Sequence, residues 1–211
     1  GGNSRGSVFV STDGAGMTFF SDAPILDLTI VAGNIAFSGY LKMRDGTVYR
    51  VDKTFLGYYW ASYLSWMRDP NGNKITFTRD ADRRLIAITD SNNRQITIER
   101  NITESPYGFG DRITYKGFGS ANRVIHLSRA NLNTVLRSGF SIQTYKELFP
   151  ELDGYTDNYD PVVATALWLP DSDGVTRRYR FLYNSYGELA RVELPTGGAI
   201  EYDWQAGLTN E

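Results

Sequence analysis

Cysteine is absent from the 211-residue sequence, and histidine occurs only once. These two features exclude disulfide bonds, a thiol nucleophile and an ordinary zinc site. Acidic residues number 24 and basic residues 22, which gives a net charge of −2, and neither sign forms a long run. Because a nucleic-acid backbone requires a basic surface, we expect no nucleic-acid partner. No apolar run approaches the roughly 18–20 residues that cross a bilayer, so we expect no membrane span.

The residues that are abundant favour a folded β-protein. Hydrophobic residues make up 41% of the chain, aromatic residues make up 14%, and glycine occurs 21 times. This composition permits a core, suits pleated strands and supplies many turns. Residues 1–5 contain neither methionine nor the apolar segment of a signal peptide. We therefore expect the chain to be a segment of a longer protein.

Apolar and polar residues alternate with a period of two in several short segments. These segments are 74–78, 95–99, 178–183 and 200–204. Glycine, proline, asparagine and aspartate separate them, and turns about every 8–12 residues are typical of β-hairpins in series. We therefore predict an all-β fold, a continuous curved antiparallel sheet of repeated hairpins with about 12 strands and a short irregular or helical insertion.

The hairpins also repeat along the chain. When Asp69 is aligned with Asp90, Asn71 falls on Asn92, which gives a period in the low twenties. A period of this size, with two strands and two turns, is typical of a repeat array. One hairpin cannot bury its apolar face alone, whereas neighbouring hairpins in one sheet can.

The regularity of the pattern varies along the chain. We expect an irregular segment with strands over 1–36, and repeat-like hairpins over 37–137 and 162–211. Residues 138–161 read as a loop with a short helix, since 144–149 fit one helical turn that ends before a proline.

Residues 69–80 resemble the repeating unit of the RHS/YD-repeat family. That unit has a D-x-x-G-N turn, an aromatic strand that ends in Tyr-Asp, and a G-R-L turn followed by a strand. Here Arg79 and Asp80 stand in the Tyr-Asp position, and Arg83 stands where Gly-Arg-Leu begins. The resemblance continues at 90–94, a second turn of the same kind.

The C-terminal stretch resembles the family pattern more closely. Residues 181–189 fit Y-D/N-x-x-G-x-L, and 194–203 are similar to the next turn and strand, while 43–49 are a weaker early copy. The residues that carry the signature share turn or strand positions of the unit. They are Asp69, Asn71, Gly72, Asp90, Asn92, Tyr183, Gly187, Pro195, Gly197, Gly198 and Tyr202.

In this family the hairpins form a long sheet that closes into a hollow shell, often around a C-terminal toxin or another polypeptide. The resemblance implies a non-catalytic wall segment of a secreted or cell-surface protein, with the rest of the parent polypeptide as its partner. The chain is too short to close a shell alone, and it lacks the segment with an aspartyl autoproteolysis site that ends many such shells. Open sheet edges invite pairing, so we expect self-association through the strand near 199–204.

Residues 58–66 are unusually rich in aromatic rings. Strict alternation predicts a strand face with Trp60, Leu64 and Trp66. The opposite face then holds Tyr59, Tyr63 and Met67. Apolar groups on both faces favour a strand that is covered on both sides. The alternative is a carbohydrate or cell-surface binding module that uses exposed rings, either Tyr59, Trp60, Tyr63 and Trp66 or the rings of 179–204.

Catalytic chemistry has little support in these residues. His126 has no G-x-S-x-G motif to serve, and we interpret it as a packed or surface side chain. Asp171 and Asp173 resemble part of a calcium loop without its distant glutamate, so turn capping is the favoured interpretation. Glu147 and Glu151 are not placed across a cleft, as a glycosidase would need. We predict no catalytic, cofactor-binding or metal-binding residue.

Overall fold

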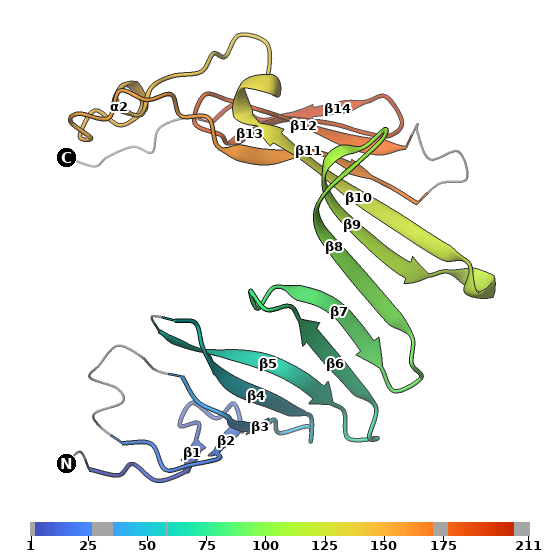
Figure 1. The fold of residues 1–211 in the computed structure, drawn as a ribbon. Helices are drawn as coiled ribbons and strands as arrows, with labels where there is room; N and C mark the ends of the chain where they lie inside the picture. The colour runs from blue at the N-terminus through green and yellow to red at the C-terminus, as the bar shows by residue number, and fades with distance from the viewer. Residues whose placement is uncertain (1–2, 27–35, 58, 171–176, 205–211) are drawn as a thin grey trace. The chain divides into compact units, whose positions relative to one another are not determined.

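The computed structural model describes residues 3–26, 36–57, 59–170 and 177–204. They form 14 β-strands that are hydrogen-bonded in chain order from β1 to β14 (Figure 1). The pairs are antiparallel, as between β1 and β2 and between β13 and β14. The predicted all-β antiparallel fold of repeated hairpins is thus confirmed, and so is the short helical insertion. The chain divides into two compact units, Gly1–Thr97 and Ile98–Glu211, and strand β8 (Gln95–Glu104) continues from the first into the second.

The first unit is an antiparallel sheet of β1 to β7 and the start of β8. Its strands are β1 (Val8–Val10), β2 (Thr18–Ser21), β3 (Gly39–Lys42), β4 (Val48–Phe55), β5 (Trp60–Arg68), β6 (Lys74–Arg79) and β7 (Leu85–Asp90). Short strands and tight turns follow from the two-residue alternation and from the turn residues between the segments.

One face of this first sheet carries a continuous apolar row. Cross-strand partners lie on the same face of a sheet, and the register aligns one apolar residue from each strand from β1 to β6. They are Phe9, Phe19, Leu41, Tyr49, Met67 and Ile75. All of them are only partly buried. Among the described residues of this unit, the buried hydrophobic side chains are few: Ile25, Ala36 and Ala87. The apolar face of this sheet therefore remains partly open.

The second unit continues the ladder and holds the helices. Its strands are the rest of β8, β9 (Gly108–Lys116), β10 (Asn122–Asn131), β11 (Val162–Trp168), β12 (Arg178–Tyr183), β13 (Leu189–Glu193) and β14 (Ala199–Glu201). Two short 3-10 helices, η1 (Phe118–Ser120) and η2 (Leu132–Thr134), and the α-helix α2 (Tyr145–Leu148) lie between strands. Strands β10 and β11 pair directly although the segment with η2 and α2 separates them in the sequence.

The segment between β10 and β11 contributes to a small core. Leu132 is fully buried, and Leu148 of α2 is buried as well. Thr144 begins α2 with a capping box, since its hydroxyl accepts from the N–H of Glu147 at 3.2 Å and the Glu147 carboxylate accepts from the N–H of Thr144 at 2.8 Å. The ring of Tyr159 meets Tyr145 edge-on at 5.3 Å between centroids. The one-turn helix predicted within 144–149 is therefore present, and its position is fixed by a cap and by packing.

Candidate functional site

The same five-residue turn recurs seven times among the described residues. In each copy the first residue donates its N–H to the carbonyl of the fifth, and the fourth donates its N–H to the carbonyl of the first. The fourth residue always has a positive φ. In six copies this is the pattern of a type I turn with a bulge, a common way to close a hairpin. The copy that begins at Gly117 differs, because its third residue, Gly119, also has a positive φ of 68°. The copies begin at Met43, Asp69, Asp80, Asp90, Gly117, Asn184 and Leu194.

An aspartate or asparagine at the first position completes this turn. The side-chain oxygen of Asp69 accepts from the N–H of Asn73 at 2.8 Å, and Asp90 accepts from the N–H of Arg94 at 3.0 Å. Asn184 does the same with the N–H of Glu188 at 3.0 Å. The hydrogen bond from the Asn73 side chain, with help from backbone N–H groups, lowers the pKa of Asp69.

The predicted signature residues occupy equivalent positions of these turns. Gly72, Gly187 and Gly197 are fourth residues, with φ of 91°, 74° and 91°. The third positions hold Asn71 and Asn92, and the last turn also contains Pro195 and Gly198. The structure thus gives these residues a common role in closing hairpins.

The structure divides the predicted ring set between the two faces of β5. Trp66 lies opposite Arg50 and Tyr63 lies opposite Asp52. Arg50 and Asp52 are two apart in β4 and therefore point to the same face. Their partners Trp66 and Tyr63 share that face, although these two are three apart in β5. The prediction that Trp66 shares a face with Trp60 is therefore wrong, because a β-bulge adds one unpaired residue to β5 and inverts the alternation after it.

Trp60 lies on the apolar face, at the end of the β4–β5 hairpin. Its ring centroid lies 5.2 Å from that of Phe55, and the Lys53 ammonium lies 5.5 Å from the Trp60 ring. Phe55, Tyr59 and Trp60 are 51%, 53% and 44% exposed. The expectation of cover on both faces is wrong for this tip. Met67, which alternation assigned to the other face, also lies on the apolar face, opposite Tyr49.

Tyr63 and Trp66 lie on the face opposite the apolar row, which is called the polar face below. Cations cover their rings there. The Lys74 ammonium is 4.8 Å and the Arg68 guanidinium 5.9 Å from the centroid of the Trp66 ring. The Arg79 guanidinium is 4.8 Å from that of Tyr63. Cation–π contacts of this kind contribute about 0.5–1 kcal/mol at exposed sites. These two rings therefore hold cations in place and do not form an open stacking platform with Tyr59 and Trp60.

The two signature tyrosines of the second unit have structural contacts. The Tyr183 hydroxyl donates to the carbonyl of Ala164 at 2.6 Å, and burial raises the pKa of this phenol. Tyr202 donates its N–H to the carbonyl of Ala190 at 3.0 Å, and its ring stacks on Trp204 with 6.3 Å between centroids. Both tyrosines thus fix the position of neighbouring chain segments.

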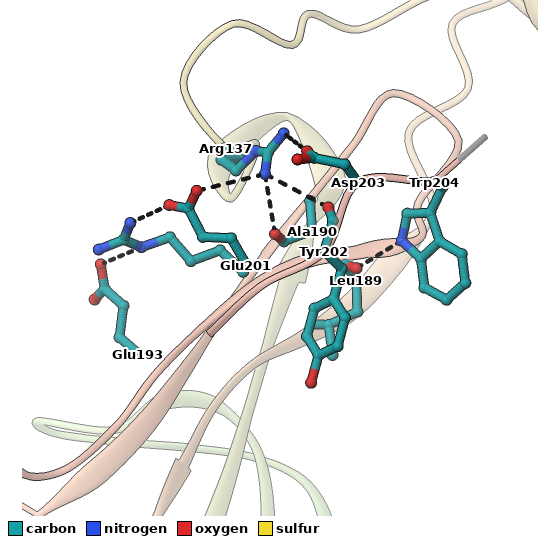
Figure 2. Close-up of polar contacts among 9 residues, drawn as sticks. Arg137, Leu189, Ala190, Glu193, Glu201, Tyr202, Asp203 and Trp204 are labelled. Carbon is teal, nitrogen blue, oxygen red and sulfur yellow. Dashed lines mark hydrogen bonds and ion pairs between the residues drawn. The ribbon is translucent and has the colours of Figure 1, made fainter. Parts of the chain in front are cut away.

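Figure 2 shows Arg137 within a polar cluster at the last strand. Its guanidinium pairs with Asp203 at 2.7 Å and lies 3.8 Å from the carboxylate of Glu201. It also donates to the carbonyls of Ala190 at 3.4 Å and Tyr202 at 3.5 Å. Arg137 thereby joins the segment after β10 to the residues that follow β14.

The cluster continues on β13 and on the residues after β14. Glu201 also pairs with Arg191, which lies 3.4 Å from the carboxylate of Glu193 (Figure 2). The Trp204 indole donates to the carbonyl of Leu189 at 2.8 Å. Of the predicted pairing strand 199–204, only Ala199–Glu201 is a strand, and the residues after it are bound to Arg137 and β13.

His126 is a packed side chain on β10. It is 7% exposed, and its ring stacks on Tyr107 with 3.6 Å between centroids. Its Nδ1 lies 3.7 Å from the carboxylate of Glu104. Burial lowers the pKa of His126, Glu104 acts against this shift, and the positive charge of Arg112 adds to it. The imidazole is therefore neutral near pH 7.

The carboxylates considered for catalysis have structural partners or lie apart. Glu147 closes the capping box of α2, and Glu151 is an exposed residue that follows this helix. Asp171 and Asp173 lie outside the described residues. Within the described part of the chain, no three His, Asp or Glu side chains gather in a way that could hold a metal ion.

Two features escaped the sequence reasoning. Arg137 gave no local signal, because the hydrogen-bond and ion-pair partners of its guanidinium lie more than fifty residues away along the chain. The cations of the polar face did leave a signal, a ring followed two residues later by a cation, at Tyr40 with Lys42 and at Trp66 with Arg68. Side chains two apart in a strand share a face, so this pattern could have shown that the face is basic.

Comparisons with other proteins give no family assignment. No model of a known protein family matches the sequence, and no curated protein matches it either. In the described segments, no helix has the length and apolar character needed to span a membrane.

Proposed function

We propose that the chain is a non-catalytic wall segment of a larger RHS/YD-repeat protein, secreted or at the cell surface, whose sheet encloses or presents another polypeptide. The recurring turn supports this proposal, because the family's D-x-x-G-N signature supplies the residues that this turn needs: a side-chain acceptor first and a residue tolerant of positive φ fourth. Pairing in chain order supports it too, because such a ladder can be extended by further hairpins.

The partly open apolar row of the first unit carries the proposal. It crosses β1 to β6 without a polar interruption, from Phe9 to Ile75. A sheet normally buries its apolar face against a second layer, and a contiguous exposed apolar patch marks an interaction surface. A wall segment satisfies this requirement, because the polypeptide inside the shell covers the face.

The test is binding of a dye that fluoresces on exposed apolar surface. We expect the native chain to bind Nile red, an uncharged dye, and Met67→Lys, in the middle of the row, to reduce this binding while the far-ultraviolet circular dichroism stays unchanged. Thr76→Lys places the same charge on the opposite face and should leave dye binding as it is, since Thr76 lies opposite Trp66. A native chain that binds no dye would contradict the proposal, and so would turnover of a substrate that is lost on a single carboxylate substitution.

The second candidate function is carbohydrate binding at the tip of the β4–β5 hairpin. The exposed rings of Phe55, Tyr59 and Trp60 favour it, because exposed rings can stack on sugars. Loss of glycan binding in Trp60→Ala would support this candidate, and unchanged binding would assign any affinity to another surface.

A further inference from the structure

A row of cations crosses the polar face of the first unit. Lys42 lies opposite Val48, Val48 opposite Arg68, and Arg68 opposite Lys74. Cross-strand partners share a face, so the three cations form one line over β3, β5 and β6. With strands about 4.8 Å apart, Lys42 and Arg68 are about 10 Å apart along this line, and Arg68 and Lys74 about 5 Å. All three side chains are exposed.

These three cations are not neutralised by the described carboxylates, since no ion pair within 4.0 Å joins them to one. Arg50 in the neighbouring row differs, because it pairs with Asp22 at 2.7 Å and with Asp52 at 2.6 Å. The Lys42–Arg68–Lys74 row therefore presents net positive charge to a ligand.

The carboxylates of the adjoining turns do not cancel this charge by contact. Asp45 accepts from the N–H of Thr47 at 2.8 Å, and Asp69 accepts from the N–H of Asn73 at 2.8 Å. Each is thus bound to its own turn.

The Trp66 ring of the neighbouring row holds two of the three cations in position. Lys74 and Arg68 both lie over Trp66, at 4.8 Å and 5.9 Å from its ring centroid. Tyr40, which is 41% exposed, lies 6.0 Å from Trp66 between ring centroids, and the Arg50 guanidinium lies 4.7 Å from the centroid of the Tyr40 ring. A cation that is already held over a ring loses less conformational freedom when it binds an anion.

Hydroxyl groups complete the chemistry of this face. Thr18 lies opposite Lys42, Thr76 lies opposite Trp66, and Thr89 lies opposite Thr76. Threonine hydroxyls both donate and accept hydrogen bonds, as sugar hydroxyls do. The face therefore combines cations, an exposed ring and hydroxyls.

We propose that this face binds an acidic polysaccharide, whose carboxylate or sulfate groups pair with Lys42, Arg68 and Lys74 and whose hydroxyl groups bond to the threonines. The proposal is independent of the wall function, because it uses the face opposite the apolar row. A single-stranded nucleic acid fits less well, since its bases need open ring faces and cations lie over both rings, Lys74 and Arg68 over Trp66 and Arg50 over Tyr40.

The experiment measures binding of the whole chain to four ligands by isothermal titration calorimetry. A polyuronate supplies carboxylates, a heparin-type polysaccharide supplies sulfates, dextran is a neutral control, and a single-stranded oligonucleotide supplies phosphates. We expect at least one acidic polysaccharide to bind, with affinity that falls as salt rises. The stronger of the two identifies the anionic group, and dextran should not bind.

Variants locate the binding surface. The double substitution Arg68→Ala with Lys74→Ala should weaken binding by about tenfold or more, because it removes two of the three cations of the row. Lys116→Ala with Arg123→Ala removes the same charge from exposed residues of the second unit and should leave the affinity unchanged. Trp60→Ala should also leave it unchanged, which separates this site from the hairpin tip, and Met67→Lys tests the wall function separately.

Three outcomes would overturn the proposal. One is a failure of both acidic polysaccharides to bind. Another is an equal loss of affinity in the Lys116→Ala, Arg123→Ala control, which would indicate non-specific charge attraction. The third is tighter binding of the oligonucleotide with the same dependence on Arg68 and Lys74, which would make nucleic acid the partner. Circular dichroism of each variant confirms that the fold is kept.

Discussion

At the residue scale, the fourth position of the repeated turn determines how much strain each copy holds. Gly72 adopts a φ of 91° there without penalty, whereas Arg83 and Asn93 adopt 65° and 58°. Asparagine tolerates this left-handed region better than most residues. A residue with a long side chain, such as arginine, does not, and the conformational penalty is about 1–2 kcal/mol for an ordinary L-residue. The turn that begins at Asp80 is therefore the most strained of the aspartate turns.

Glycine at position 83 should relieve this strain. We expect Arg83→Gly to raise the free energy of unfolding, as measured by urea titration. Relief of the backbone strain contributes about 1 kcal/mol, and a few tenths of this are lost because glycine has greater freedom in the unfolded chain. The matched change is Gly72→Ala, which should lower stability by a similar amount. A Cβ at Gly72 would meet no atom within 4 Å, so its effect is that of the backbone alone. A loss of stability in Arg83→Gly would mean that the arginine side chain contributes more than its backbone costs.

His126 should make stability depend on pH in a defined window. Burial lowers its pKa in the folded state below the ordinary value of 6.5, so the unfolded chain binds its proton more readily. The contribution of the neutral imidazole is complete above about pH 6.5 and is lost as the pH falls through the lower pKa of the folded state. We expect urea titrations at pH 7.5 and 5.0 to show lower stability at pH 5.0.

The variant His126→Phe isolates this effect, because it keeps a ring to stack on Tyr107 and removes the titrating group. His126 is the only histidine, and the lowered pKa values of aspartates such as Asp69 and Asp90 act at lower pH. The variant should therefore lose most of the stability difference between pH 7.5 and 5.0. An unchanged difference would show that another group titrates in this window.

At the scale of elements, the hairpins could be predicted because their signals are local. Alternation marked the strands at 74–78 and 95–99, which are β6 and the start of β8, and the spacing from Asp69 to Gly72 marked a turn. These signals depend on backbone sterics and on hydrogen bonds within five residues. The helical turn after Thr144 was equally predictable, since its capping box lies within four residues.

The faces of the strands were harder to predict, because they depend on pairing between strands. The bulge in β5 follows from its register with β4, and nothing local marks it, so strict alternation fails for Trp66 and Met67. The same holds for Arg137, whose partners Glu201 and Asp203 are brought to it by the order of β11 to β14. A site built across strands therefore needs the register before its side chains can be assigned to one face.

At the scale of the whole chain, a ladder in chain order ends in two strands that have only one partner each among the described residues, β1 and β14. Unpaired strand edges present free N–H and C=O groups to other chains. The side chains after β14 are fixed by Arg137, but this does not occupy the outer backbone edge of Ala199–Glu201. Pairing through this edge, with further repeats or with a second copy, remains the prediction for how the chain associates.

A proline at position 199 tests this prediction. Gly198 accepts from the N–H of Leu194 at 2.7 Å and Tyr202 donates to the carbonyl of Ala190 at 3.0 Å, so both face β13. Backbone groups alternate along a strand, so Ile200 also faces β13 and the N–H of Ala199 points outward. Proline is tolerated where the N–H points away from the ladder. We expect Ala199→Pro to reduce self-association in sedimentation equilibrium without lowering Tm, and Ile200→Pro to lower Tm because it removes a ladder hydrogen bond. Self-association that persists in a folded Ala199→Pro chain would contradict pairing through β14.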